Sequence, residues 1–344
     1  MRWRKLFDRE IDEGYGGKNR MKRGSKTAAW LLAGMLLAGS GNMNISIAAQ
    51  SGEPLRCISF YSSVNGVSST IFYVTESLQK NLEGDKEISL SVYSLSTDLY
   101  ESLEYKVKTA AALDMDVMIL SDLPEDLDPD ILELLQKNHI FVIVVDGQPS
   151  SYENSAWIGT DNREMGVRAA QLGAERVAEY QAGVLATSFR GGTISASRKE
   201  RQVGFEQEAA RQEGMTVLPE QICTSNGLEA MQRVRDYMSE NPDMNLIYCL
   251  DSASGITASR VLLEQGRTDD VFVICYDLVE QVLQEMKQGG IDAVIEQDTD
   301  GIGRRVAGFL KKIKKEGTGE LAGSEIAVPG RIVEADDVGG AQNE

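Results

Sequence analysis

Polar side chains follow several apolar, β-branched segments of this chain at the point where each segment ends. Residues 140–145 (IFVIVV) have the length and composition of a buried strand, and Asp146 comes directly after them. Asp251, Asp277 and Gln297 take the same place after later segments. Because carboxylate and amide groups make several hydrogen bonds at once, this set suits a small ligand rich in hydroxyl groups. A strand-terminal Asp also commonly caps the next helix, so a structural role is an equal alternative for each Asp taken alone.

Two further groups of residues would extend such a site. A polar loop follows the first apolar segment, and a basic cluster, Arg198, Lys199 and Arg201, lies near the start of a helical segment. A guanidinium in that cluster would add a planar fork of hydrogen-bond donors. The predicted ligand-binding residues are Ser63, Asn65, Ser68, Asp146, Lys199, Arg201, Asp251, Asp277 and Gln297.

A regular alternation of strand and helix patterns provides the scaffold for these residues. Apolar segments such as 182–187, 245–250 and 270–276 alternate with helical segments such as 252–265. This alternation predicts parallel sheets covered by helices on both faces. The polar turn at 160–161 divides the strands into two groups, and ligands bind at the carboxyl ends of strands in open α/β sheets. We therefore predict an α/β fold of two doubly wound parallel-sheet lobes with a cleft between their strand ends.

Composition and charge exclude several classes of function. The chain is 42% hydrophobic and 26% charged, which is typical of a globular protein. Its net charge is -18, from 35 Lys and Arg against 53 Asp and Glu. A surface this acidic repels phosphate backbones, so we expect no nucleic-acid partner.

Sequence motifs for catalysis are weak. His139 is the only histidine, which leaves little basis for a histidine zinc site or for Ser-His catalysis. Residues 191–193 (GGT) are typical of a flexible loop, and a phosphate cradle is the lesser alternative. A pair of strand-end aspartates leaves glycoside hydrolysis open as an alternative. We predict no enzyme, no cofactor and no metal.

The cysteines match neither a zinc pattern nor a C-x-x-C motif, and all lie in or beside apolar segments. We therefore expect them to be small buried hydrophobic residues, with a disulfide between Cys249 and Cys275 left open. The remaining cysteines are Cys57 and Cys223.

An export segment precedes the part that is expected to fold. Residues 21–26 (MKRGSK) are basic, 27–39 are apolar, and 46–48 (SIA) resemble a cleavage site. The apolar stretch is short for a membrane span, but 27–49 contains no charged residue, so an uncleaved anchor remains an alternative to cleavage. We assign residues 1–50 to a leader or anchor. The folded part is then expected outside the cytoplasm, in the periplasm or at the cell surface.

Four segments of the chain resemble a known family. The chain is similar to periplasmic sugar-binding proteins of the ribose-binding type, whose type I fold is also used by lactose-repressor-like regulators. The resemblance implies two lobes joined by three hinge crossings, a reversibly bound sugar and delivery to a membrane partner. It places 52–160 plus 298–321 in lobe one and 161–297 plus 322–344 in lobe two. The segments are IFVIVVDGQP with IGTDNREMG, SRKERQVGFEQEA, NLIYCLDSASGITASRVLLEQGR, and VFVICYDLVEQVLQEMKQGGIDAVIEQDTDGIG.

The resemblance also assigns roles by position. It implies that Asp146 accepts from a sugar hydroxyl, that Lys199 or Arg201 is the arginine position that bonds the sugar, and that Asp277 and Gln297 make the remaining polar contacts. Asp251 stands where many members have Asn.

Three positions depart from the pattern of ribose binders. Gly147 stands where those proteins carry Arg, and Ser68 and Ser69 stand where they place two aromatic rings. Ribose specificity is therefore not expected, and extra carboxylate with less arginine would also suit a cationic or amine-bearing ligand.

The leading hypothesis is an exported solute-binding protein that closes on a small polar ligand, with sugars as the first class to consider. It would present this ligand to an ABC-type permease. The alternative is a membrane-tethered sensory subunit of a histidine kinase, and an exported glycoside hydrolase is the least favoured reading.

Overall fold

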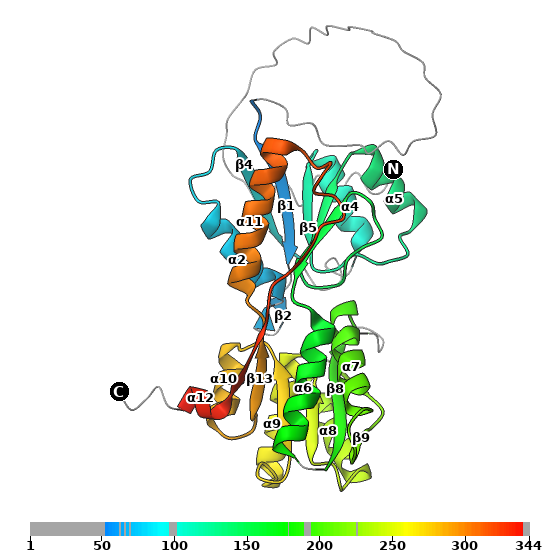
Figure 1. Ribbon diagram of the computed structural model, residues 1–344, viewed down its shortest axis with the longest axis vertical. Coiled ribbons are helices and arrows are strands. Elements are labelled where there is room, and N and C mark those ends of the chain that lie inside the picture. Colours follow the sequence, from blue (N-terminus) through cyan, green and yellow to red (C-terminus); the bar gives the residue numbers. More distant parts are fainter. Residues whose placement is uncertain are drawn as a thin grey trace, which may run out of the picture. The chain divides into compact units, whose positions relative to one another are not determined.

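Two sheets, each covered by helices on both faces, organise the part of the chain described here (Figure 1). The computed structural model describes residues 52–61, 63–64, 67–68, 70–95, 102–177, 179–188, 194–224 and 226–339. All of them belong to the unit Asn44–Glu344. The predicted fold class, two doubly wound parallel-sheet lobes, is confirmed.

The first sheet has the strand order β14-β7-β6-β5-β1-β4, and every neighbouring pair is parallel. Alternate residues of its strands pack on opposite faces, as Val117 and Met118 do, so the central strands β5 and β6 are apolar throughout. Helices α2 and α11 cover one face, and α4 and α5 cover the other. The bounds are β1 Leu55–Tyr61, α2 Thr70–Asn81, β4 Ile88–Ser94, α4 Leu103–Ala112, β5 Val117–Leu120, α5 Pro129–Lys137, β6 Phe141–Val144, β7 Ser155–Gly159, α11 Thr299–Glu316 and β14 Glu325–Ala327.

The second sheet has the order β10-β8-β11-β12-β13-β15, with β9 also paired to β8. Its pairs are parallel except β13 with β15. Helices α6 and α7 cover one face, and α8, α9 and α10 cover the other. The bounds are α6 Asn162–Arg176, β8 Tyr180–Ser188, α7 Ala196–Ala209, β9 Met215–Val217, β10 Gln221–Thr224, α8 Gly227–Glu240, β11 Leu246–Cys249, α9 Ser252–Gln265, β12 Phe272–Tyr276, α10 Glu280–Lys287, β13 Ala293–Glu296 and β15 Arg331–Glu334.

The chain passes between the two sheets at three places, between β7 and α6, between β13 and α11, and between β14 and β15 (Figure 1). A short antiparallel pair, β2 (Ser63–Val64) with β3 (Val67–Ser68), follows β1, and α12 (Ala335–Gly339) follows β15. Each sheet presents the carboxyl ends of its parallel strands toward these crossings, because every crossing leaves the end of a parallel strand.

Two elements of the tail and the second sheet differ from expectation. The apolar segment 216–222, for which the alternation predicts one strand, forms parts of two strands, β9 and β10, separated by residues that include Pro219, which has no N–H to donate to a ladder. Strand β14 pairs with β7 of the first sheet, whereas the range 322–344 was assigned to lobe two. The return to the second sheet therefore comes after Ala327, and β15 completes it.

The cysteines and the histidine have structural positions. All four cysteines are free and buried, so the disulfide left open between Cys249 and Cys275 is not formed. His139 is exposed in the turn before β6. Within the ranges given above, no helix has the length and apolar character needed to cross a bilayer. The leader at 21–49 lies outside the described residues.

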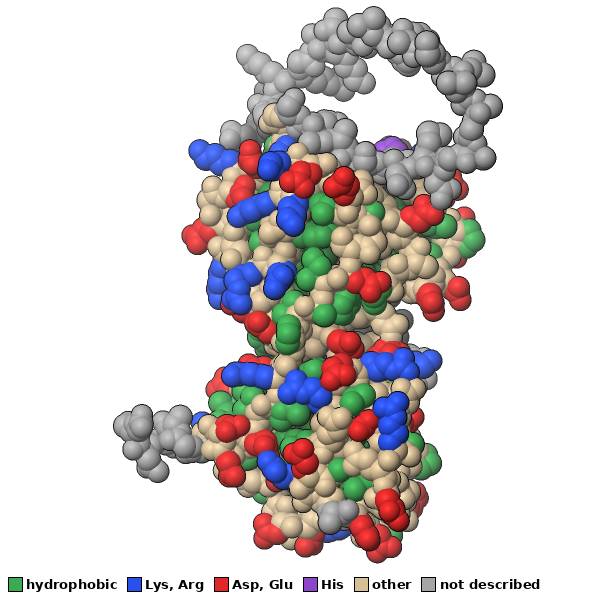
Figure 2. Space-filling view, viewed as in Figure 1, with side chains coloured by type: hydrophobic (Ala, Val, Ile, Leu, Met, Phe, Trp, Pro, Cys, Tyr) green, Lys and Arg blue, Asp and Glu red, His purple; other side chains and the backbone are tan. Residues whose placement is uncertain are grey.

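Charge is distributed unevenly on the face drawn in Figure 2, where basic side chains gather over α11. The outer side of this helix exposes Arg304, Arg305, Lys311, Lys312 and Lys315. Lys311 lies 3.7 Å from the Asp85 carboxylate. The apolar side of α11 packs on the first sheet, so the basic residues on the outer side of this helix form a solvated face.

Candidate functional site

Arg201, on α7, is the most enclosed charged side chain of the predicted set, with 3% of its side chain exposed. Its Nε donates to Asn162 Oδ1 at 2.8 Å, and its Nη1 donates to the carbonyl of Leu250 at 2.8 Å. The guanidinium carbon lies 3.9 Å from the centroid of the Tyr276 ring. Burial lowers the pKa of Arg201, but Asp277 and Asp146 more than offset this effect and raise it overall. The group is thus a fixed cation.

Close packing of α6 on α7 sets the position of this arginine. A Cβ on Gly204 would come within 2.0 Å of the Arg163 carbonyl, and one on Gly166 within 2.1 Å of the Arg201 carbonyl. Both glycines are therefore required for the two helices to approach this closely. The contact brings the first residue of α6, Asn162, within hydrogen-bond distance of Arg201.

Asp146 approaches Arg201 from the end of β6, in the other sheet. Its Oδ1 lies 3.7 Å from Arg201 Nη2, a distance that gives attraction but no hydrogen bond. This oxygen is buried and has no hydrogen-bond partner among the described residues. Burial raises the pKa of Asp146 to about 6; Arg201 opposes that rise and Asp277 adds to it. The carbonyl of Asp146 accepts from Asn162 Nδ2 at 2.9 Å, so Asn162 contacts both charged residues.

Gln297 and Asp277 form a second polar pair. Gln297 follows β13 and is 4% exposed, and its Nε2 donates to Asp277 Oδ1 at 2.8 Å. The same Nε2 lies 3.4 Å from Oγ1 of Thr70, at the start of α2 in the first sheet. Gln297 Oε1 is buried and has no partner in the described part of the chain. Asp277 has a φ of 65°, in the left-handed region, where residues other than Gly are uncommon.

Asp251, in contrast, is fully engaged in local structure. Its Oδ1 accepts from the N–H of Ser254 at 2.8 Å, as the N-cap of α9, and its Oδ2 accepts from the N–H of Thr187 at 2.8 Å. Arg198 Nε lies 3.3 Å from the same Oδ2. The structural alternative weighed from the sequence, a strand-terminal Asp that caps a helix, therefore describes Asp251.

The remaining predicted residues make no described side-chain contact with this site. Lys199 is exposed on α7, whereas Arg201 is buried and belongs to the polar cluster, which consists of Asp122, Asp146, Asn162, Arg201, Tyr276, Asp277 and Gln297. Ser63 and Ser68 pair in the β2–β3 hairpin, and their side chains are not among those described. Asn65 and the loop 191–193 lie outside the described residues.

Several residues of the cluster were not in the predicted set. One is Asn162, the first residue of α6, whose N-cap is Asp161, which accepts from the N–H of Glu164 at 3.0 Å. Asp122 follows β5 as Asp146 follows β6, so the same strand-end rule indicates it. Burial raises the pKa of Asp122, and Lys106 opposes the rise. Tyr276, under the guanidinium, gave no sequence signal beyond its place in an apolar strand.

Gly147 has a steric reason to lack a side chain. A Cβ at this position would come within 2.4 Å of Asp122 Oδ1 and 3.2 Å of Asp122 Cα. Its N–H also donates to the carbonyl of Ser121 at 2.6 Å, which holds the two strand ends together. An arginine after Asp146 is therefore incompatible with the position that Asp122 takes here.

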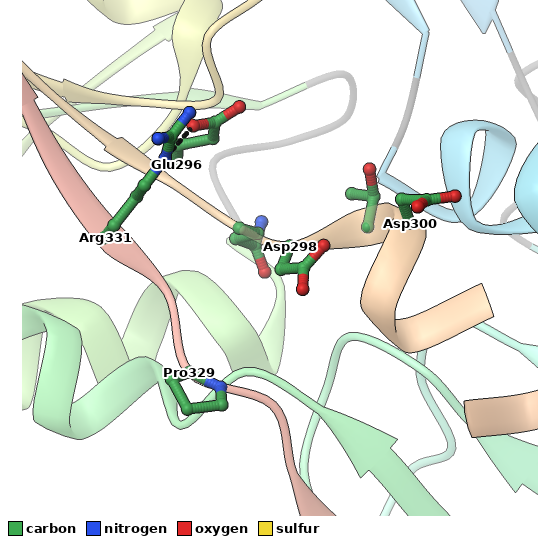
Figure 3. A pocket seen from close by; sticks show the side chains of 7 residues that line it. Glu296, Asp298, Asp300, Pro329 and Arg331 are labelled. Carbon is green, nitrogen blue, oxygen red and sulfur yellow. Dashed lines mark hydrogen bonds and ion pairs between the residues drawn. The ribbon is translucent and has the colours of Figure 1, made fainter. Parts of the chain in front are cut away.

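A pocket of about 380 Å³ lies at the crossings, lined by residues 296–300, Pro329 and Arg331 (Figure 3). Arg331 on β15 donates from Nε to Glu296 Oε2 at 2.5 Å, and a dashed line in Figure 3 marks this pair. Of the predicted residues it contains Gln297 alone. We take the polar cluster rather than this pocket as the candidate site, because the cluster holds the unpaired buried acceptors Asp146 Oδ1 and Gln297 Oε1.

No group of three or more His, Cys, Asp or Glu side chains in the described ranges is arranged to hold a metal ion. The groups that the candidate site offers to a ligand are hydrogen-bonding and charged side chains. These groups present acceptors and one fixed cation to a small polar molecule.

The sequence matches the family of the periplasmic binding protein domain over residues 106–318. The chain belongs to this family. The resemblance described from the sequence is thereby confirmed, and so is the prediction that this periplasmic binding protein is not an enzyme.

Solved structures share the fold of this periplasmic binding protein at low sequence identity. An ABC transporter solute-binding protein from Burkholderia graminis, in complex with D-arabinose, has a TM-score of 0.73 and 14% identity, with 85% of this chain and 99% of that chain covered. One from Bacillus halodurans with bound myo-inositol has a TM-score of 0.71 and 15% identity, covering 86% and 99%. A putative LacI transcriptional regulator from Bacteroides fragilis has a TM-score of 0.72 and 16% identity, covering 83% and 99%. No curated protein matches the sequence.

Proposed function

We propose that this protein is an exported solute-binding protein that captures a sugar or a similar polyol between its two sheets. One observation carries the proposal: Asp146, after β6 of the first sheet, and Arg201, on a helix that covers the second sheet, face each other at 3.7 Å without a hydrogen bond. A ligand hydroxyl fits this arrangement, because its oxygen can accept from Arg201 Nη2 while its proton is donated to Asp146 Oδ1. Closure on such a ligand would satisfy the buried carboxylate oxygen, which otherwise costs free energy.

The second polar pair supports the same ligand class. Gln297 offers Oε1 as an unused acceptor, and its Nε2 already holds Asp277 in place. The ligands named for the structural neighbours, D-arabinose, myo-inositol and D-allose, are all small molecules with several hydroxyl groups. Such molecules match a site that combines acceptors from both sheets with one guanidinium.

The proposed site consists of Asp146, Arg201, Asp277 and Gln297, with Asn162 as the residue that positions Arg201. We leave Asp251 and Lys199, which the sequence also suggested, out of this proposed site, because one caps α9 and the other is exposed. Ser63, Asn65 and Ser68 stay predictions, since their side chains are not described. The cofactor expectation is unchanged: none is needed to bind a polyol.

A ligand screen tests the proposal directly. The purified full chain would be heated with D-arabinose, D-allose or myo-inositol, each at a concentration series up to the millimolar range. Ligand at 100 times its Kd stabilises the native state by about 2.7 kcal/mol, which is a readily measured rise in Tm. Stabilisation by at least one polyol, lost in Asp146→Ala, supports the proposal. Absence of stabilisation by any sugar or polyol contradicts it.

We further propose that the membrane partner is an ABC-type permease, with a histidine kinase as the alternative. The resemblance to transporter binding proteins supports the permease. The uncharged stretch 27–49 supports a tethered sensor if it is retained. The mass of the amino terminus in membranes and in the soluble extracytoplasmic fraction separates the two, since a processed soluble form favours transport and a retained leader favours sensing.

A further inference from the structure

The charges around Asp146 do not balance within the described residues. The groups that act on one another here are the carboxylates of Asp122, Asp146, Asp251 and Asp277 and the cations Lys106, Arg198 and Arg201. Four carboxylates thus face three cations.

Two of the carboxylates have partners of their own. Arg198 lies against Asp251 at 3.3 Å, and the charge of Lys106 acts on Asp122. Arg201 is left with both Asp146 and Asp277, which together raise its pKa. The cluster therefore carries one negative charge that no described cation compensates. Of the stretches that follow strand ends and lie outside the described residues, 62, 65–66 and 69 contain no charged residue, 96–101 contains Asp98 and Glu101, and 189–193 contains Arg190.

The unpaired hydrogen-bonding groups of the site also favour a ligand that donates. The buried polar atoms of the site that lack partners are Asp146 Oδ1 and Gln297 Oε1, and both can only accept. Arg201 donates through Nε and Nη1 and Gln297 donates through Nε2, so Nη2 is the guanidinium nitrogen left to donate to a ligand. The site therefore combines two unpaired buried acceptors with an excess of carboxylate over cations.

We infer that the ligand carries one protonated amine, as in an amino sugar or an amine-bearing polyol, and that this ammonium lies between Asp146 and Asp277. The inference rests on the proposed function, because it names the class of polyol that the site selects. An ammonium supplies one positive charge and three donors, which suit the excess carboxylate and the two unpaired acceptors. A neutral sugar would leave a buried carboxylate uncompensated when the cleft excludes water, and that is costly.

Matched ligand pairs test the inference on the full chain by isothermal titration calorimetry. Each neutral hexose (D-glucose, D-galactose, D-mannose) is compared with its 2-amino-2-deoxy form and with the N-acetylated form, which removes the charge. We expect at least one amino sugar to bind tenfold or more tightly than both its neutral and its N-acetyl counterparts. In Asp277→Asn this preference should fall to less than threefold.

The control variant is Asp336→Asn, which removes one negative charge from an exposed position on α12, outside the cluster. It should keep the full amine preference. Neutral hexoses or polyols that bind as tightly as the amines would overturn the inference and leave the proposed function standing. If no sugar or polyol of either kind binds, the proposed function fails as well.

Discussion

Asn162 Oδ1 accepts a hydrogen bond from Arg201 Nε at 2.8 Å, across the tight contact between α6 and α7. The same side chain donates from Nδ2 to the carbonyl of Asp146 at 2.9 Å. The amide of Asn162, at the first crossing between the sheets, thus holds both the guanidinium of Arg201 on α7 and the backbone at the end of β6. This relationship explains how residues 55 positions apart in the sequence are brought to one site.

Replacing Asn162 should therefore weaken ligand binding through Arg201. In Asn162→Ala the guanidinium loses a charge-assisted hydrogen bond, which is worth about 1.5–3 kcal/mol, so the Kd should rise roughly tenfold or more. Titration calorimetry with any ligand that stabilises the protein measures the change. Asn162→Asp keeps the acceptor for Arg201 but loses the donor to Asp146, so its Kd should lie between those of wild type and Asn162→Ala. An unchanged Kd in Asn162→Ala would show that Arg201 is positioned without it.

The glycines between α6 and α7 should be indispensable to stability. Gly204→Ala places a Cβ within 2.0 Å of the Arg163 carbonyl, and such overpacking costs about 1–3 kcal/mol. The midpoint of urea unfolding should fall accordingly. Gly308→Ala is the matched control, because Gly308 is exposed on α11 with no atom near its Cβ position. That helix should gain about 0.5–1 kcal/mol. Equal effects of the two substitutions would contradict the packing described here.

Asp146 should make stability depend on pH between about 4 and 6. Its pKa is raised from 3.8 to about 6 in the folded protein, so over this range the native state binds the proton that the unfolded state has released. Stability is then highest below pH 4 for this group and is lost as the pH rises through 6. Asp146→Asn should therefore stabilise the ligand-free protein at pH 7, by at most about 3 kcal/mol, since each unit is worth 1.36 kcal/mol.

Unfolding by urea at pH 4 and at pH 7 checks this prediction. The difference between Asp146→Asn and wild type should shrink toward zero at pH 4. Asp292, whose pKa burial also raises to about 6, contributes the same trend to both proteins and cancels in the comparison. A variant that is less stable than wild type at pH 7 would mean that the attraction to Arg201 outweighs the burial of the carboxylate.

Asp277 should tolerate Asn better than Ala. Its φ of 65° is accessible to Asn and Asp, whereas Ala pays about 1–2 kcal/mol in the left-handed region. Asp277→Asn should thus unfold close to wild type, and Asp277→Ala should lose roughly 1 kcal/mol before any ligand is added. Thermal unfolding of the ligand-free variants decides this point. If ligand-free Asp277→Ala is as stable as Asp277→Asn, the left-handed backbone conformation at this position does not affect stability.

The fold could be predicted from the sequence because buried parallel strands leave a strong signal. Segments such as 140–145 are apolar on both faces, and each is followed by a polar turn and a helix. What the pattern did not resolve was the tail, where strands of only a few residues, such as β14, choose between two sheets by tertiary contacts. Pro219 does indicate the break between β9 and β10 in the sequence, because proline has no N–H to donate to a ladder.

The site was predicted less completely, because a strand-end position does not say which atoms a side chain meets. Asp251 stands directly before α9 and caps it, whereas Asp277 stands three residues before α10 and does not. That spacing distinguishes the two residues. Helical periodicity likewise favours Arg201 over Lys199, since Arg201 shares a face with Gly204 and Phe205. The amide of Asn162 needed the structure, because its partners come from three separate segments.

The central claim, that both sheets contribute to one binding site, is tested most directly by a double-mutant cycle in ligand affinity. Asp146→Asn and Arg201→Lys would be titrated singly and together, by calorimetry, with a polyol that binds the wild-type chain. If one ligand group contacts both residues, the combined loss should differ from the sum of the single losses by about 0.5–3 kcal/mol. Losses that add within about 0.3 kcal/mol, or variants that bind as wild type does, would contradict a shared site.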